Sequence, residues 1–198
     1  MTRVKICGLR REVDIDYVNA AHPDYAGFVF AEGRRQISHG TARELRSLLD
    51  RTIIPVGVFA DSPIDEIVGI VRNGTIDAIQ LHGKESSEYI SKLKAVSSVP
   101  VIQAVNMNEE GMFGIPDTDA DMLLLDGGTG GTGTSFDWSS VRGIRKDFFL
   151  AGGLNMYNVR KAIDLVRPYA VDISSGVEIN GRKDGDLIKD TIRRVRDV

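Results

Sequence analysis

The sequence predicts an α/β protein that folds as a single (β/α)8 barrel of the TIM type over residues 1–198. Three observations support this prediction: eight short apolar runs, their even spacing, and segments of helical pattern between them. The runs begin about 22 to 28 residues apart, close to the length of one βα unit in an eight-unit barrel. The predicted strands cover residues 3–7, 25–30, 53–59, 76–81, 99–105, 121–126, 147–153 and 169–174.

The segments between the strands carry apolar residues at helical spacing. Five of them are predicted as helices, at residues 41–50, 62–74, 85–96, 154–166 and 184–198. Ser62 followed by Pro63 predicts the start of the second of these helices, and Asn73 with Gly74 predicts its end. The connector over 106–120 contains two glycines and a proline, so we expect the helix of the fifth unit to be shortened or missing.

The apolar runs decide between two architectures. A run such as DMLLL at 121–125 shows no polar alternation, which is typical of parallel strands buried on both faces. A closed barrel and an open doubly wound sheet both contain such strands. The even repetition favours the barrel, because an open sheet usually has a point where strand order reverses. In a barrel, chemistry lies at the carboxyl ends of the strands, so residues at those ends are the candidates for a site.

Composition excludes other classes of protein. Apolar residues make up 42% and charged residues 27% of the chain, which is typical of a globular protein. A net charge of -3 provides no basic field for nucleic acid, so we expect a small-molecule substrate. No apolar run approaches the roughly 20 residues of a membrane span, and the first residues lack a signal-peptide pattern. Because the single cysteine cannot form an internal disulfide, we expect a cytoplasmic protein. We expect either a monomer or a homodimer.

Two strand-end residues are candidates for acid-base chemistry. Cys7 ends the first strand and precedes Gly8, where the chain can turn and leave the thiol at the mouth; a cysteine that only fills space is the alternative. Positive charge is needed to lower the pKa of a thiol that acts as base or nucleophile, and Lys5 and Arg35 are candidates to supply it. Asp126 ends the strand LLLD, where burial can raise the pKa of a proton donor; a turn former is the alternative.

Glycines follow three of the predicted strands. The loop after Asp126 has glycines at 128, 130 and 133 in a G-x-G-x-x-G spacing, but it lacks the helix start and the acidic residue that a dinucleotide site requires. We interpret it as a flexible active-site loop. The junctions after the seventh and eighth strands are predicted to bind phosphate through backbone amides; ordinary tight turns are the alternative. The residues predicted for this role are Gly152, Gly153, Ser175 and Gly176.

Four other residues lie near the predicted mouth. Arg34 and Arg35 follow the second strand, where an arginine can bind a substrate carboxylate through its fork of donors. His82 ends the fourth strand and Asp172 lies in the eighth, and both are predicted to bind substrate. Since His82 has no partner histidine or cysteine at ligand spacing, we expect it to form hydrogen bonds and we expect no metal.

A set of short motifs runs in one order from Val4 to Asp184. They are VKICG, GFVF, VGVF, QLHG, LLLD, the glycine-rich loop with FDW, AGGLN, and VDISSGVE with KD. Through these motifs the chain resembles the phosphoribosylanthranilate isomerase family of tryptophan biosynthesis. The resemblance implies a (β/α)8 barrel that converts N-(5-phosphoribosyl)anthranilate into 1-(2-carboxyphenylamino)-1-deoxyribulose 5-phosphate by an Amadori rearrangement, without cofactor or metal.

The resemblance also implies roles for particular residues. Cys7 matches the general base of the family and Asp126 its general acid. Arg35 matches the arginine that contacts the anthranilate moiety, because it precedes 36–38 as that arginine precedes an aromatic, an aliphatic and a serine. The stretch AEGRRQ departs from the family's proline-containing pattern by one position, so Arg34 is the alternative. Rival interpretations are the sister isomerase of histidine biosynthesis, which has an aspartate in place of Cys7, ribulose-phosphate epimerase, and a catalytically silent sugar-phosphate binding protein.

Overall fold

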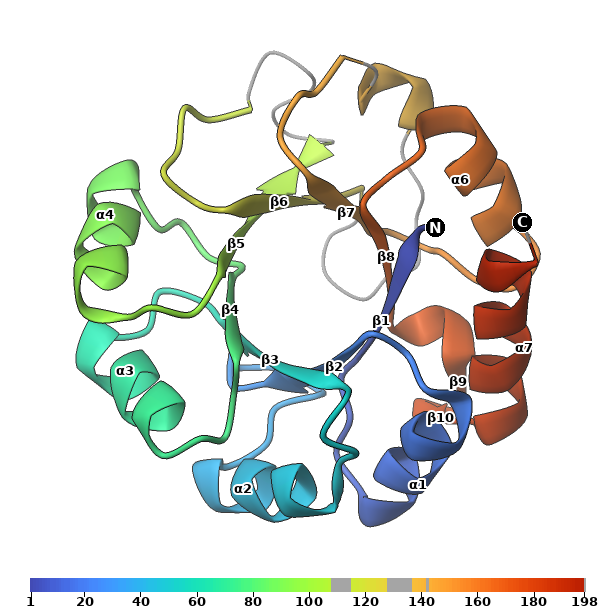
Figure 1. Cartoon of the computed structure of the whole chain (residues 1–198), viewed down its shortest axis with the longest axis horizontal. Coiled ribbons are helices and arrows are strands. Elements are labelled where there is room, and N and C mark those ends of the chain that lie inside the picture. The colour runs from blue at the N-terminus through green and yellow to red at the C-terminus, as the bar shows by residue number, and fades with distance from the viewer. Residues whose placement is uncertain (108–114, 128–136, 142, 198) are drawn as a thin grey trace.

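The computed structural model describes residues 1–107, 115–127, 137–141 and 143–197. Eight parallel strands form a closed barrel in sequence order (Figure 1). β8 closes the ring on β1, with Lys5 opposite Asp172. The predicted barrel is therefore confirmed and the open doubly wound sheet is excluded. The strands are β1 (Arg3–Cys7), β2 (Tyr25–Val29), β3 (Ile54–Phe59), β4 (Ala78–Leu81), β5 (Val101–Asn106), β6 (Met122–Asp126), β7 (Phe148–Leu150) and β8 (Ala170–Ile173).

The α-helices lie outside the barrel and cover the outer face of its strands (Figure 1). They are α1 (Glu12–Ala21), α2 (His39–Leu48), α3 (Ile64–Arg72), α4 (Ser87–Val96), α6 (Val159–Val166) and α7 (Gly185–Arg196). All five predicted helices are confirmed, and α1 is an additional helix that the sequence analysis did not single out. Three of the helices begin with a side-chain cap that satisfies a free backbone N–H, because Ser38, Ser86 and Asp184 each accept a bond from the first turn.

Local chemistry moves two predicted boundaries. The N-cap of α3 is Pro63 and not Ser62, whereas Asn73 and Gly74 end this helix as predicted. α6 begins at Val159, later than predicted, because the side-chain amides of Asn155 and Asn158 donate to the Gly153 carbonyl, at 3.2 and 2.9 Å, and hold the preceding residues in a loop.

The connectors after β5 and β6 are described only in part. Between β5 and β6, Met107 is helical and residues 115–121 contain no helix. The rest of the predicted weak fifth helix, residues 108–114, lies outside the described residues. Between β6 and β7, the described residues form only a 3-10 helix, η2 (Trp138–Val141). The prediction of a shortened or missing fifth helix therefore stays a prediction.

The strands bury both faces, as their apolar runs predict. One face packs under the helices, and the other fills the lower part of the barrel with residues such as Val56, Ala78, Leu124 and Phe149. Nearer the carboxyl ends, the inward positions change from apolar to polar. Gln80, Asp126 and Asp172 each follow an inward apolar residue of the lower layer by one step of the strand alternation, and Lys5 and Cys7 occupy inward positions of β1. The fold thus places these five polar inward side chains at the carboxyl end.

Candidate active site

A cavity of about 430 Å³ opens at the carboxyl ends of the strands. It is lined by all but one of the predicted site residues: Cys7, Arg35, His82, Asp126, Gly152, Gly153, Asp172 and Ser175. Gly176 is the exception. Its neighbour Ser175 lines the cavity, while Gly176 itself packs against the preceding βα loop. Barrel closure therefore gathers residues from the beginning, middle and end of the chain around one space.

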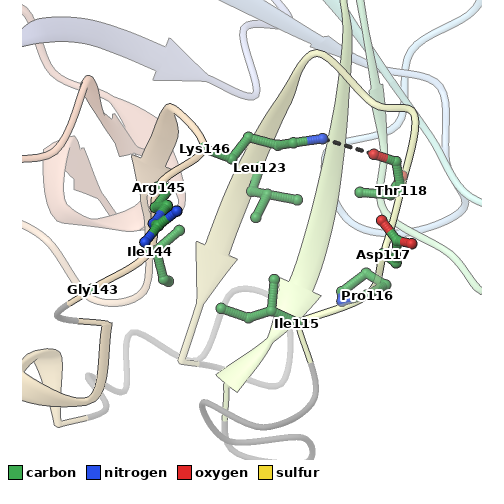
Figure 2. Close-up of a pocket in the computed structure, with 9 residues that line it drawn as sticks. All are labelled: Ile115, Pro116, Asp117, Thr118, Leu123, Gly143, Ile144, Arg145 and Lys146. Carbon is green, nitrogen blue, oxygen red and sulfur yellow. Dashed lines mark hydrogen bonds between the residues drawn. The ribbon is translucent and has the colours of Figure 1, made fainter.

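A second cavity of about 410 Å³ lies away from these residues (Figure 2). It is formed by the connector before β6, by Leu123 and by the connector before β7. Leu123 belongs to the apolar cluster under the helices, so this cavity is on the outer side of the barrel wall. Lys146 donates to the backbone carbonyls of Thr118 and Ala120, both at 2.7 Å, so its ammonium is already bound. The two cavities are similar in volume, and their chemistry distinguishes them.

Cys7 lies at the end of β1 and is only 7% exposed. A Cβ at Gly27 on β2 would stand 2.6 Å from its sulfur, so the glycine makes room for the thiol. Burial raises the pKa of the Cys7 thiol, the Lys5 ammonium opposes this, Asp172 raises the pKa further, and Lys183 lowers it. Burial prevails, so the thiol is protonated at neutral pH, and two buried lysine side chains lie near enough to stabilise a thiolate.

The charge beneath Cys7 is an ion pair inside the barrel. Lys5 Nζ lies 2.9 Å from Asp172 Oδ1, and the lysine side chain is fully buried. Burial lowers the pKa of Lys5, but the Asp172 carboxylate and the Cys7 sulfur outweigh it, so the pKa lies above its usual value. Lys5 therefore stays charged, as a buried lysine can only when an anion lies beside it.

Asp126 lies at the end of β6, three strands from Cys7 around the ring. Its Oδ2 is 3.7 Å from His82 Nε2. Gln80 Nε2 lies 3.0 Å from His82 Nδ1, within hydrogen-bond distance. The histidine predicted to bind substrate is therefore also a neighbour of the predicted acid.

Gln80 is a cavity residue that the sequence analysis missed. Its Oε1 is buried and has no hydrogen-bond partner among the described residues. Buried acceptors without a donor are costly, so a hydroxyl group of a ligand is a suitable partner. The alternation of β4 contained the signal, since Gln80 has the same inward parity as the core residue Ala78.

The glycine junctions after β7 and β8 pack against each other. Gly152 and Gly153 have φ of 88° and 65°, which ends the predicted strand over 147–153 early and requires glycine. Ser175 and Gly176 begin the 3-10 helix η3 (Ser175–Val177), and a Cβ at Gly176 would collide with the Leu154 carbonyl oxygen. In the described part of the chain, the backbone N–H groups of Gly153, Ser175 and Gly176 have no acceptor. These amides are available to an anion.

Arg35 and Arg34 both line the cavity, but they differ in exposure and in the number of bonds that hold each side chain. The Arg35 side chain is 14% exposed and donates from Nε and Nη2 to Glu178, at 2.8 and 2.9 Å. Arg34 is 60% exposed and contacts Glu178 once, at 3.2 Å. A Cβ at Gly8 would collide with the Arg35 side chain. The lack of a side chain at Gly8 therefore makes room for Arg35. Arg35 is the arginine with the fixed geometry.

Glu178 and Lys183 were not predicted as site residues. Lys183 is buried, and its Nζ lies 2.8 Å from Glu178 Oε1. Burial raises the pKa of Glu178, but Arg35 and Lys183 outweigh this effect and lower it to about 2. The Asn-Gly pair at 180–181 is a turn signal that could have revealed the hairpin on which both residues lie.

No three His, Cys, Asp or Glu side chains among the described residues gather closely enough to hold a metal ion. None of the described helices is both long and apolar enough to cross a membrane. The glycines at 128, 130 and 133 lie outside the described residues, so the prediction of a flexible loop there stays a prediction.

Comparison with known proteins identifies the family. The family model described as N-(5'phosphoribosyl)anthranilate (PRA) isomerase matches residues 4–194. An N-(5'-phosphoribosyl)anthranilate isomerase from Endomicrobium trichonymphae is 47% identical over 200 residues, which cover 99% of each chain. The crystal structure of phosphoribosyl anthranilate isomerase from Thermus thermophilus superposes with a TM-score of 0.88 at 32% identity, covering 99% of each chain.

A third relative was solved with a ligand. This phosphoribosyl anthranilate isomerase is in complex with reduced 1-(o-carboxyphenylamino)-1-deoxyribulose 5-phosphate, and it matches with a TM-score of 0.83 and 35% identity over the whole of both chains. The family match and the relatives agree with the barrel and with the motifs of the sequence. The chain therefore belongs to the N-(5'-phosphoribosyl)anthranilate isomerase family and is an isomerase.

Proposed function

We propose that this chain converts N-(5'-phosphoribosyl)anthranilate into 1-(2-carboxyphenylamino)-1-deoxyribulose 5-phosphate in tryptophan biosynthesis, with Cys7 as general base and Asp126 as general acid. One observation carries the assignment of roles. Cys7 and Asp126 end two different strands of the barrel and line the same cavity, and a buried ammonium lies beneath the thiol. The reaction needs an acid and a base on a single sugar, and this arrangement supplies both.

The reaction follows from the chemistry of the two groups. Asp126 protonates the furanose ring oxygen, and the ring opens to an iminium ion. Cys7, as thiolate, then removes the proton from C2, and the resulting enolamine tautomerises to the ketone. The acid must be protonated when the base is ionised, so the two groups require different surroundings. The ammonium groups of Lys5 and Lys183 supply the charge that favours the thiolate.

The two ends of the substrate are held by different parts of the site. The free amides of Gly153, Ser175 and Gly176 bind the phosphate, and Gly152 lets the chain turn toward it. Arg35 binds the anthranilate carboxylate at the other end.

Asp172 and His82 contact the sugar between these ends, together with Gln80. A substrate fixed at both ends presents its reacting carbons to the acid and base without further ordering, which is a large part of the catalytic effect.

Support for the substrate comes from a relative. The phosphoribosyl anthranilate isomerase solved with reduced 1-(o-carboxyphenylamino)-1-deoxyribulose 5-phosphate binds a compound that carries both the carboxyphenylamino group and the phosphate. The cavity of this chain offers an arginine for the first group and free amides for the second. Cys7 separates this function from that of the histidine-pathway isomerase, which the resemblance places with an aspartate at this strand.

The test is a direct assay with purified protein. We expect the fluorescence of phosphoribosylanthranilate to decay on addition of the enzyme, and product to accumulate in equal amount. The histidine-pathway substrate is measured in parallel. Absence of turnover with tight binding of a product analogue would identify a silent sugar-phosphate binding protein instead.

Assembly and location belong to the same proposal. We propose a monomer or a homodimer that acts in the cytoplasm, without cofactor or metal. Light scattering coupled to size-exclusion chromatography distinguishes the two assemblies, and activity after dialysis against a chelator tests independence from metal.

A further inference from the structure

A β-hairpin follows β8 and lies outside the ring of barrel strands, next to α1 (Figure 1). Its strands are β9 (Glu178–Ile179) and β10 (Arg182–Lys183). Asn180 and Gly181 connect them with φ of 51° and 73°, as a two-residue turn of type I′ requires. Because Lys183 pairs directly opposite Glu178, the turn places the two charged side chains side by side.

Glu178 is the centre of a buried charge cluster. Its carboxylate is 5% exposed and accepts from Arg35 twice and from Lys183 Nζ once. Lys183 also donates to the Ser174 carbonyl at 2.9 Å, and Ser174 Oγ donates to the Cys7 carbonyl at 3.0 Å. The cluster is therefore tied to the end of β1, where the thiol lies.

Two arginines of the first βα loop hold the hairpin in place. Arg10 donates from Nη2 to the Gly181 carbonyl and from Nη1 to the Arg34 carbonyl, both at 2.8 Å. Arg11 donates to the Lys183 carbonyl at 3.1 Å. The loops after β1, β2 and β8 thus form one connected unit, which limits the positions that Arg35 can take.

The bond to Glu178 leaves a defined part of Arg35 for a ligand. A guanidinium has five N–H donors, and Glu178 occupies the edge formed by Nε and Nη2. Nη1 has no acceptor among the described residues, so the edge formed by Nη1 and Nη2 remains for a second carboxylate. Arg35 lines the cavity, and a fork of this kind matches a planar carboxylate.

We propose that Glu178, supported by Lys183, is a positioning residue that holds Arg35 so that its remaining edge receives the carboxylate of the substrate. This inference rests on the proposed role of Arg35. The opposite interpretation is that Glu178 occupies Arg35 and competes with the substrate. The two differ in sign, because removing the charge of Glu178 weakens carboxylate binding if it positions Arg35 and strengthens it if it competes.

The experiment measures two ligands by isothermal titration calorimetry on the full chain. The first is the reduced product analogue, and the second is the same compound without its carboxyl group. For Glu178→Gln we expect the Kd of the first ligand to rise by about tenfold, as loss of a charged hydrogen bond implies, while the Kd of the second changes by less than about twofold. Equal weakening of both ligands, or tighter binding of the first, overturns the proposal.

Further variants separate this proposal from the one on which it rests. Arg35→Ala should abolish the preference for the carboxylated ligand; if the preference survives, the role of Arg35 and the proposal both fall. If Arg35→Ala abolishes it and Glu178→Gln does not, the proposed function stands and only the role of Glu178 is wrong. In the Arg35→Ala background, Glu178→Gln should have no added effect on the preference.

Two controls guard against a general loss of structure. Glu88→Gln makes the same chemical change in an exposed ion pair on α4 and should leave both Kd values unchanged. Glu178→Asp keeps the charge on a shorter side chain, and it should weaken the carboxylated ligand less than Glu178→Gln does. If Glu178→Gln does not fold, the test rests on Glu178→Asp alone. In that case, a ratio of the two Kd values in Glu178→Asp that equals the wild-type ratio overturns the proposal.

Discussion

The two ends of the barrel interior both contain polar side chains, but they use them differently. At the amino end, the hydroxyl groups of Tyr25 and Tyr169 are 3.1 Å apart, and Arg3 donates to both. The Arg3 guanidinium also lies over the Tyr169 ring, 4.9 Å from its centre. Burial raises the pKa of Tyr25 to about 12, and the bond to Tyr169 adds to this, so the phenol is neutral at physiological pH.

At the carboxyl end, the polar groups are charged or titratable and border an open cavity. Lys5, Asp172 and Cys7 lie close together there, and Asp126 lines the same space. The comparison teaches that burial of polar groups alone does not indicate function. At the amino end the groups are satisfied by each other and stabilise the barrel, whereas at the carboxyl end they are arranged around room for a ligand.

The largest expected effect is that of Cys7→Ala. Turnover should fall by at least about a hundredfold, the low end for a positioned base, because the variant lacks the group proposed to take the proton from C2. The thermal midpoint should shift by no more than about 4 °C, since only one small side chain is lost. The measurements are steady-state kinetics and a thermal melt, and normal turnover would show that Cys7 only fills space.

Asp126→Asn should reduce turnover on the same scale, about a hundredfold, because the amide cannot donate the proton that opens the ring. The substitution keeps the shape of the side chain, so binding of the reduced product analogue should change little. A variant with the wild-type rate would make Asp126 a turn residue and remove the acid from the proposed mechanism.

Arg35→Ala tests the substrate-binding side of the same end. We expect KM to rise by about tenfold, as loss of a charged hydrogen bond implies, with a smaller fall in kcat. Arg34→Ala should raise KM less, because Arg34 is the more exposed of the two. A larger effect at Arg34 would contradict the alignment of this loop and assign the carboxylate to the other arginine.

At the carboxyl end, Glu178 makes the contribution of its ion pairs to the free energy of unfolding depend on pH in the acidic range. Its pKa is about 2 in the folded chain against an ordinary value of 4.5, so its ion pairs add stability above pH 4.5 and lose it as the pH falls toward 2. Urea unfolding from pH 6 to pH 3 should therefore show the free-energy difference between wild type and Glu178→Gln shrinking with acidity. A difference that is the same at both ends of this range would be evidence against the buried pairs.

Tyr25→Phe should have the smallest effect, and it should lower the stability of the protein while leaving turnover unchanged. It removes a hydroxyl that bonds to Arg3 and Tyr169, and we expect about 1 kcal/mol less free energy of unfolding. Turnover should remain at the wild-type value, as measured in the same assay as Cys7→Ala. A loss of turnover here would show that the two ends are coupled and are not separate in their roles.

Much of the fold was predictable because each strand and helix is encoded locally. The apolar runs have the right length and spacing for buried parallel strands, and the turn and cap residues mark where they stop. Cys7 and Asp126 became candidates for the same reason, since a residue at the end of a buried strand is visible in the sequence.

Gln80, Glu178 and Lys183 escaped prediction because their importance depends on partners. Gln80 is one polar residue inside an apolar run, and only its position on the inner wall makes its free oxygen significant. Glu178 and Lys183 resemble ordinary surface charges in sequence. They are buried only because the hairpin folds against the loops after β1 and β2.

The sequence by itself determined the barrel, the family and the strand ends at which chemistry can occur, since these depend on local pattern and motif. Only the tertiary structure decided the electrostatics of the site. Lys5 meets Asp172, and Arg35 meets Glu178, across more than a hundred residues of chain, and barrel closure alone brings such distant segments together. The physical reason is that charge acts through space, so the state of a thiol or an arginine is set by neighbours whose distance no local pattern records.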